Sequence, residues 1–108
     1  MEKLVSIIIP TYNSADFIAD TLASVQQQTY PNWEVILVDD GSTDITLAIA
    51  QNIAQTDQRI RIFKNPTNSG TGVTRNNALH HCQGNYIAFL DADDVWKPNK
   101  LERQLQFM

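Results

Sequence analysis

The sequence contains few features that would cross-link the chain, anchor it in a membrane or draw it to nucleic acid. Its 108 residues include a single cysteine, Cys82, so no disulfide can form within the chain. The apolar segment at residues 4–10 is far shorter than the roughly 20 residues of a membrane-spanning helix. The sequence has eight Lys and Arg but 12 Asp and Glu, and this excess of acidic residues argues against a protein that binds the phosphate backbone of nucleic acids. We therefore expect a reducing, cytoplasmic setting, no transmembrane segment and no nucleic-acid partner.

Two familiar phosphate-binding signatures are also missing. The P-loop pattern G-x-x-x-x-G-K-[ST] occurs nowhere in the sequence. The segment GTGVTR places Arg75 where the dinucleotide fingerprint needs its third glycine, and it follows the third predicted strand instead of the first. The sequence therefore supports neither a P-loop nor a Rossmann dinucleotide site.

What the sequence does contain is a series of short apolar runs. Continuous, largely β-branched and aliphatic runs at residues 4–9, 33–40 and 85–91 predict interior strands of a parallel sheet, buried on both faces. Residues 59–65 are more polar and predict a weaker strand near an edge of the sheet. Apolar residues make up 43% of the chain, which is enough for one compact domain with a single core.

Amphipathic segments between and after these runs predict helices. In the first helix, Ile18, Leu22 and Val25 recur at helical spacing, and Ser14 is the expected N-cap. Pro98 is expected in the first turn of the last helix. The four predicted helices cover residues 14–29, 42–56, 72–82 and 98–107.

The second helix carries the same pattern. Ile45, Ile49 and Ile53 would face the core, and Ser42, Thr43 or Asp44 would cap the helix. Strands therefore alternate with helices along the whole chain. This order predicts an α/β fold, a Rossmann-like layered sheet of mainly parallel strands flanked by helices.

The acidic residues are concentrated where such a sheet would bind a ligand. In layered α/β sheets, ligands collect outside the carboxyl ends of the strands, at a switch in strand order. Six of the nine aspartates lie in two clusters at two predicted strand ends: Asp39, Asp40 and Asp44, then Asp91, Asp93 and Asp94.

The segment Asp91-Ala92-Asp93 favours a site for a divalent cation. Carboxylates packed so closely repel one another, and burying one without a partner would cost several kcal/mol. A hard cation such as Mn²⁺ or Mg²⁺ prefers oxygen ligands and keeps places for substrate phosphates and water. The alternative for the same residues is a solvated turn in which one Asp caps the next helix.

Three further residues near strand ends are candidates for contacts with a ligand. Asp39 ends the second strand, where an acceptor could pair with an N–H of a base. The ring of Tyr12 could lie against a planar group, and Arg75 could contact a pyrophosphate near the start of the third helix. Turn chemistry explains Gly41 and Ser42 without requiring Asp39. The ordinary alternatives are a tyrosine packed on the next helix and a surface salt bridge of the arginine.

Three segments, taken together and in order, resemble the family 2 glycosyltransferases, an inverting group with the glycosyltransferase A-type fold. They are residues 5–44, which end in VDDGSTD, residues 68–79, NSGTGVTRNNAL, and residues 84–96, GNYIAFLDADDVW. The resemblance implies that Thr11 and Tyr12 flank or stack on the base of a nucleotide-sugar donor. Asp39 corresponds to the family's residue that recognises the uracil ring by accepting a hydrogen bond from it.

The same resemblance assigns the diphosphate side of the donor. Arg75 corresponds to the basic residue near the diphosphate. Asp91 and Asp93 correspond to the ends of the family's D-x-D motif, with Asp91 nearer the ribose and Asp93 on the metal. The implied cofactor is Mn²⁺ or Mg²⁺, bound by these two carboxylates, and Asp93 is the catalytic candidate because the metal acts through it.

The implied reaction is transfer of a sugar from a nucleotide sugar, UDP being the expected nucleotide, to a hydroxyl of a glycan or lipid-linked acceptor, with inversion. The resemblance also implies a role in cell-surface polysaccharide or glycan biosynthesis. We expect the protein in the cytoplasm, where peripheral association with the inner face of the membrane fits that role. Residues 1–108 correspond to the donor-binding portion, and the family's acceptor-binding half lies outside them. We therefore expect this chain alone to bind donor without transferring sugar.

Two other classes of protein compete with this interpretation. A non-catalytic nucleotide-binding module could keep the fold without the reaction. A receiver-type phosphoacceptor domain also binds Mg²⁺ through acids at strand ends, but it needs paired acids after the first strand. The first predicted strand here ends in Pro10-Thr11-Tyr12, which counts against a receiver domain.

Overall fold

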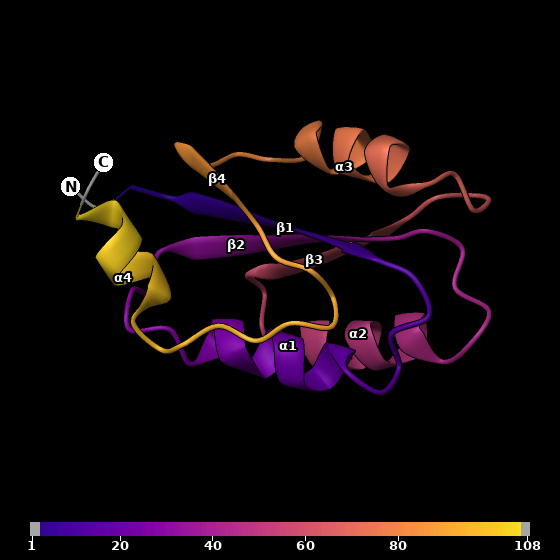
Figure 1. Cartoon of the computed structure of the whole chain (residues 1–108), viewed down its shortest axis with the longest axis horizontal. Coiled ribbons are helices and arrows are strands. Elements are labelled where there is room, and N and C mark those ends of the chain that lie inside the picture. The colour runs from indigo at the N-terminus through magenta and orange to yellow at the C-terminus, as the bar shows by residue number, and fades with distance from the viewer. Residues whose placement is uncertain (1–2, 107–108) are drawn as a thin grey trace.

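Four parallel strands form the sheet on which the molecule is built (Figure 1). The computed structural model describes residues 3–106. The spatial order of the strands is β3-β2-β1-β4, and every pairing is parallel. The α/β fold class is therefore confirmed, as is the edge position of the more polar third strand. The strands are β1 Val5–Thr11, β2 Trp33–Asp39, β3 Ile60–Lys64 and β4 Tyr86–Phe89.

Helices cover both faces of this sheet. In Figure 1, α1 and α2 lie side by side below the sheet and α3 lies above it, while α4 sits near the end where the chain begins. No helix within residues 3–106 is long and apolar enough to cross a membrane. The helices are α1 Ile18–Gln26, α2 Thr46–Ala54, α3 Thr71–Leu79 and α4 Lys100–Leu105.

The two central strands are buried on both faces, as their continuous apolar sequences predict. Ile7 and Ile9 of β1 point into the larger core, which α1 and α2 cover, whereas Ile8 joins a smaller core with Ala78 of α3. All three isoleucines have no exposed surface. Alternation along one strand thus fills two cores, because successive side chains point to opposite faces.

The interior position predicted for the last strand is wrong. β4 pairs with β1 alone within the part of the chain that the structure describes, so it is an edge strand. Ile87 is 45% exposed and Phe89 51% exposed. The reason is that α3 packs mainly over β1 and β2, which leaves these two side chains of β4 uncovered. An apolar run predicts a buried strand, but it does not tell whether that strand has one neighbouring strand or two.

The predicted cap of the first helix is also wrong. α1 begins at Ile18 and has Phe17 at its N-cap position, without a side-chain cap. The Ser14 hydroxyl instead donates to the carbonyl oxygen of Tyr12, 3.0 Å away. Pro98 likewise lies before its helix, because α4 has Asn99 at the N-cap position.

The second helix corrects two further expectations. Ile45 lies at the N-cap position, is 66% exposed and does not face the core. Ile49 and Ile53 do pack against the core, as predicted. Neither Ser42 nor Thr43 caps the helix. Ile45 at the N-cap position has no side-chain cap, and the Asp44 carboxylate accepts from the backbone N–H of Thr46, the first residue of the helix, at 3.0 Å. Of the three predicted caps, which all lie within residues 3–106, Asp44 alone bonds to the first residue of the helix, and the isoleucine before the helix is left outside.

Candidate functional site

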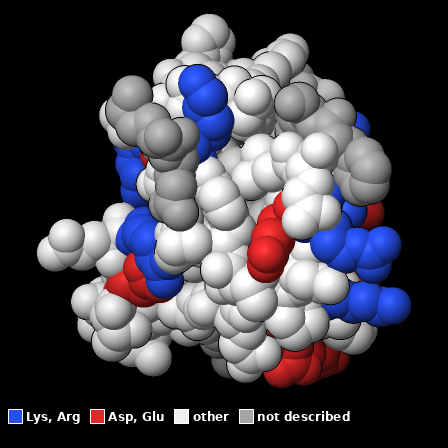
Figure 2. All heavy atoms as spheres, turned by 90° about the vertical axis from the view of Figure 1, so that its left-hand side faces the viewer, with Lys and Arg blue, Asp and Glu red and all other residues white. Residues whose placement is uncertain are grey.

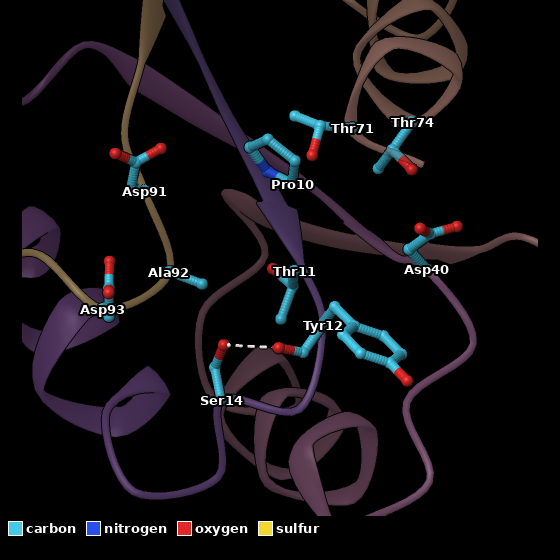
Figure 3. A pocket seen from close by; sticks show the side chains of 10 residues that line it. All are labelled: Pro10, Thr11, Tyr12, Ser14, Asp40, Thr71, Thr74, Asp91, Ala92 and Asp93. Atoms are coloured by element: carbon cyan, nitrogen blue, oxygen red, sulfur yellow. Dashed lines mark hydrogen bonds between the residues drawn. The ribbon is translucent and has the colours of Figure 1, made fainter. Parts of the chain in front are cut away.

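A pocket of about 340 Å³ opens at the carboxyl ends of the strands, where β1 lies between β2 and β4 (Figure 3). The chain builds the sheet outward from β1 to β3 and then returns to place β4 on the other side of β1. The pocket therefore lies at the switch in strand order, where the sequence placed a ligand site. Its lining residues are Pro10, Thr11, Tyr12, Ser14, Asp40, Thr71, Thr74, Asp91, Ala92 and Asp93.

Four of the predicted site residues meet in this pocket. Thr11 and Tyr12 come from the end of β1, and Asp91 and Asp93 come from the loop after β4. In Figure 3 the two carboxylates lie along one side of the pocket and the Tyr12 ring lies on the other. Tyr12 is 47% exposed, so part of its side chain is open to a ligand.

Asp39 lies just behind the pocket and does not line it. Its side chain is only 2% exposed. Its Oδ1 accepts from the Ser42 hydroxyl at 2.5 Å and its Oδ2 accepts from the Ser42 backbone N–H at 2.9 Å. A carboxylate oxygen has two lone pairs, so each oxygen keeps one lone pair that Ser42 does not use.

Arg75 also stays outside the pocket lining. It is exposed on α3, and its guanidinium carbon lies 5.4 Å from the ring centroid of Phe89 on β4. The same helix contributes Thr71 and Thr74 to the pocket wall, which lie four residues and one residue before Arg75. The roles of Arg75 and Asp39 toward a ligand therefore stay predictions.

Sequence reasoning gave no role to Asp40, which lines the pocket and is 6% exposed. Its Oδ1 accepts from the Asn65 side chain at 2.8 Å and from the backbone N–H of Ser69 at 2.7 Å, and its Oδ2 accepts from the backbone N–H of Gly70 at 2.9 Å. Burial alone would raise the pKa of Asp40, but these hydrogen bonds to the carboxylate outweigh it and lower the pKa below its usual range.

This carboxylate ties the start of α3 to the end of β2. The three groups that donate to Asp40 belong to residues 65–70, the segment that leads into α3. Asn65 also donates to the Thr74 hydroxyl at 2.9 Å. Gly41 permits this close approach, because it has φ +76° and a Cβ there would lie 2.9 Å from the backbone nitrogen of Asn68. The Asp-Gly pair at a strand end was the signal in the sequence.

The loop that carries the other two acids is held from behind by α1. The Thr21 hydroxyl lies 2.9 Å from the carbonyl oxygen of Ala92 and 2.7 Å from that of Asp94. Ala92 is buried, whereas the side chains of Asp91 and Asp93 on either side of it are exposed. The backbone is thus fixed while the two carboxylates remain open to a ligand.

The pocket offers a cation an incomplete set of ligands. Within residues 3–106, no group of three or more His, Cys, Asp or Glu side chains could hold a metal ion by itself. Asp91 and Asp93 nevertheless supply hard oxygen donors on one side of an open pocket. This arrangement suits Mn²⁺ or Mg²⁺ that takes its other ligands from substrate phosphates and water.

The opposite end of the sheet has a different surface. Figure 2 looks at the end near the amino termini of the strands, where Lys and Arg side chains are interspersed with acidic ones. The pocket end, in contrast, brings three carboxylates to one cavity: Asp40, Asp91 and Asp93. An anionic ligand would bind this cavity more readily with a cation present, because the cation offsets the repulsion between the carboxylates and the ligand.

Comparison with known proteins identifies the family. The family model described as "Glycosyl transferase family 2" matches residues 6–108. TuaG of Bacillus subtilis (strain 168), provisionally named as a teichuronic acid biosynthesis glycosyltransferase, is 53% identical over 107 residues, which are 99% of this chain and 42% of TuaG. The Escherichia coli protein named "UDP-Glc:alpha-D-GlcNAc-diphosphoundecaprenol beta-1,3-glucosyltransferase WfgD" is 44% identical over 107 residues, again 99% of this chain and 42% of the relative.

Solved structures agree with the sequence comparison. S. aureus TarS 1-349 in complex with UDP-GlcNAc matches 95% of this chain and 30% of that chain with a TM-score of 0.89 and 37% identity. The mannosyltransferase PcManGT from Pyrobaculum calidifontis, in complex with GDP-Man and Mn²⁺, matches 89% of this chain and 29% of that chain with a TM-score of 0.83 and 32% identity. The chain spans 42% of the length of the two curated relatives. Its sequence and its layered sheet together show that the chain belongs to glycosyl transferase family 2.

Proposed function

We propose that this chain forms the donor site of an inverting glycosyltransferase that uses a UDP-sugar with Mn²⁺ or Mg²⁺. The sugar would pass to a hydroxyl of a glycan or lipid-linked acceptor in cell-surface polysaccharide biosynthesis, on the cytoplasmic side of the membrane. One observation carries the proposal: a pocket at the switch in strand order joins Tyr12 to the acidic pair Asp91 and Asp93. The likeness to a TarS structure in complex with UDP-GlcNAc supports the choice of nucleotide.

The residues in and beside the pocket would each contact a different part of the donor. The exposed part of the Tyr12 ring would lie against the base, and the unused lone pairs of Asp39 would accept from a base N–H. Arg75 would approach the diphosphate from α3. Asp91 would lie toward the ribose and, with Asp93, would hold the cation.

Transfer would be a single displacement at the anomeric carbon. The acceptor hydroxyl attacks from the face opposite the diphosphate, the bond from the anomeric carbon to the diphosphate oxygen breaks, and a general base takes the hydroxyl proton. The cation would neutralise the charge that develops on the leaving nucleoside diphosphate. Attack from the opposite face inverts the configuration.

We further propose that this chain alone binds donor without turnover. Of the carboxylates that line the pocket, Asp40 is engaged by hydrogen bonds, and Asp91 and Asp93 are assigned to the donor and its cation. Within residues 3–106, no carboxylate of the pocket is left to deprotonate an acceptor hydroxyl. Residues 1–108 would then be the donor-binding portion of a longer catalytic domain.

Calorimetric titration with UDP, with and without Mn²⁺, tests the donor site. We expect Mn²⁺ to strengthen UDP binding at least tenfold, because it offsets the repulsion between the pocket acids and the diphosphate. Asp93→Asn should remove most of that gain. Asp94→Asn is the matched control, because Asp94 is an exposed neighbouring acid that does not line the pocket. An equal metal effect in all three proteins would contradict the assignment of Asp93.

Transfer is tested separately with labelled UDP-sugars and a panel of glycan and lipid-linked acceptors. We expect no turnover by this chain and turnover by a protein that includes the family's acceptor-binding half. Turnover by this chain that Asp93→Asn abolishes would contradict the donor-only proposal. A chain that binds UDP in a metal-dependent way, but stays inactive when extended, would instead be a non-catalytic nucleotide-binding module.

A further inference from the structure

Two loops at the mouth of the pocket are joined through one serine. The first loop, residues 12–17, follows β1, and the second, residues 40–45, follows β2. The Ser42 hydroxyl in the second loop donates to Asp39 Oδ1 at 2.5 Å and accepts from the backbone N–H of Asn13 in the first loop at 2.9 Å. The same oxygen therefore bonds both to the Asp39 carboxylate and to the residue that follows Tyr12.

The orientation of the Asp39 carboxylate depends on this serine. Within residues 3–106, both hydrogen bonds to the Asp39 side chain come from Ser42, one from its hydroxyl and one from its backbone N–H. Two bonds to two different oxygens fix the plane of the carboxylate. Because Asp39 is almost fully buried, it has little water to replace either bond if one is lost.

The direction of Tyr12 depends on the same connection. Asn13, the next residue, has φ +47°, in the left-handed region that non-glycine residues seldom adopt. Its backbone N–H is held by Ser42, and its side-chain Oδ1 accepts from the backbone N–H of Thr43 at 2.8 Å. This turn sets the path of the chain on either side of Asn13, so the second loop fixes the position of Tyr12.

We propose that Ser42 is a positioning residue for the base of the nucleotide. Its hydroxyl holds the Asp39 carboxylate and the turn after Tyr12 in one fixed arrangement, so that the hydrogen-bond acceptor and the ring face the base together. The inference rests on the proposed donor site and adds a residue to it. Ser42 itself does not line the pocket and acts through its two neighbours.

The test compares two adjacent hydroxyl deletions in the same loop. Ser42→Ala removes the hydroxyl that bridges Asp39 and Asn13 and leaves the Ser42 backbone N–H in place. Thr43→Ala is the matched control, because within residues 3–106 the single hydrogen bond of the Thr43 hydroxyl is a long 3.4 Å contact with Asn13, at an exposed position. Calorimetry measures UDP and pyrophosphate, both with Mn²⁺, and an NMR titration measures uridine, which lacks phosphate.

We expect Ser42→Ala to weaken UDP and uridine by about tenfold, the size expected for one lost buried hydrogen bond. Pyrophosphate binding should change less than about twofold, since the diphosphate is assigned to other residues. Thr43→Ala should bind all three ligands as the unaltered chain does, and Ser42→Thr, which keeps a hydroxyl, should recover most of the affinity for uridine. A merely structural role would weaken all three ligands alike.

Three results would overturn the inference: unchanged uridine binding in Ser42→Ala, equal weakening of uridine and pyrophosphate, or no recovery in Ser42→Thr. If Ser42→Ala does not fold by circular dichroism, Ser42→Cys takes its place. A thiol is a weaker donor and a weaker acceptor than a hydroxyl, so the bonds to Asp39 and Asn13 should weaken, and uridine binding should weaken while pyrophosphate binding should not. Uridine binding unchanged in Ser42→Cys would also overturn the inference. Absence of UDP binding by the unaltered chain would overturn the proposed function instead.

Discussion

Two pairs of aspartates end two strands of the same sheet and have opposite environments. Asp39 and Asp40, the β2 acidic pair, are buried and accept hydrogen bonds from neighbouring loops. Asp91 and Asp93, the β4 acidic pair, are exposed, and within residues 3–106 no protein donor is bonded to either carboxylate. Identical side chains at equivalent places thus have different uses, because burial forces one pair to find partners in the protein and exposure leaves the other pair for a ligand.

The comparison separates stability from binding. Removing a buried acceptor leaves its donors without partners, which destabilises the fold even in the absence of any ligand. Removing an exposed carboxylate costs the fold little, but it takes away a ligand for a cation. The predictions below use this difference, from the largest expected effect to the smallest.

Asp40→Ala should lower the free energy of unfolding by about 3 kcal/mol, because it takes the acceptor from the buried Asn65 side chain and from the backbone N–H groups of Ser69 and Gly70. Asp93→Ala should lower it by less than about 0.5 kcal/mol, as exposed positions usually do. Urea denaturation followed by circular dichroism measures both. Equal losses in the two variants would mean that the two acidic pairs do not differ in the way proposed.

Gly41→Ala should cost about 2 kcal/mol, because a side chain at φ +76° is strained and its Cβ would meet the backbone nitrogen of Asn68 at 2.9 Å. Gly72→Ala is the control. Gly72 lies in the first turn of α3 with open space around it, so alanine there should be neutral or slightly stabilising. Thermal and urea unfolding measure the change in stability of each variant relative to the unaltered chain. A Gly41→Ala protein as stable as the unaltered chain would show that residues 65–70 can move away at no cost.

The stability that the Asp40 carboxylate contributes should disappear in acid. Its pKa is lower in the folded chain than the ordinary value of about 3.9, so its contribution is complete above that value and is lost as the pH falls through the folded pKa. The unaltered chain should therefore exceed Asp40→Asn by about 1 kcal/mol at pH 7, and by less as the pH drops below about 4. Urea unfolding of both proteins at several pH values measures the difference. A difference that stays constant down to pH 3 would contradict the assigned cause.

Mn²⁺ without nucleotide should have the smallest effect. Two carboxylates on one side of an open pocket bind a cation weakly, so millimolar Mn²⁺ should raise the melting temperature by less than about 2 °C. Mn²⁺ together with UDP should raise it further, because the diphosphate supplies more oxygen ligands. Differential scanning fluorimetry measures both shifts. A large shift with Mn²⁺ alone would indicate a more complete metal site than the β4 acidic pair.

The sequence predicted those parts of the fold that depend on hydrophobic pattern. Ile7, Ile8 and Ile9 form a continuous apolar run, and such a run has one common explanation, a strand buried on both faces. Ile87 and Phe89 belong to a similar run but are exposed, because their burial depends on neighbours that no local pattern specifies. Helix starts were predicted wrongly because a local pattern does not specify the partner of a hydroxyl either. The Ser14 and Ser42 hydroxyls bond to the turns around them instead of capping a helix.

The candidate site likewise has one part that the sequence predicted and one part that it did not. Thr11, Tyr12, Asp91 and Asp93 follow directly from strand ends, and the structure brings them into one pocket. Asp40 was missed as a site residue, because its importance comes from residues 65–70, which meet it only after β3 has been added to the sheet. A sequence reveals a strand end, but the partners that a distant loop provides depend on the finished topology.

The parallel order β3-β2-β1-β4 also has a consequence for how the chain folds. Within the sheet, Val5 pairs with Trp33 on one side and with Tyr86 on the other. The first pairing joins residues close in sequence, whereas the second closes a loop of almost the whole chain, and closing longer loops costs more chain entropy and slows folding. We expect β1, β2 and β3 to associate first and β4 to join them last. The pocket between β1 and β4 would then be completed in the final step of folding, and thermal fluctuations that detach β4 would open it before any other part of the core.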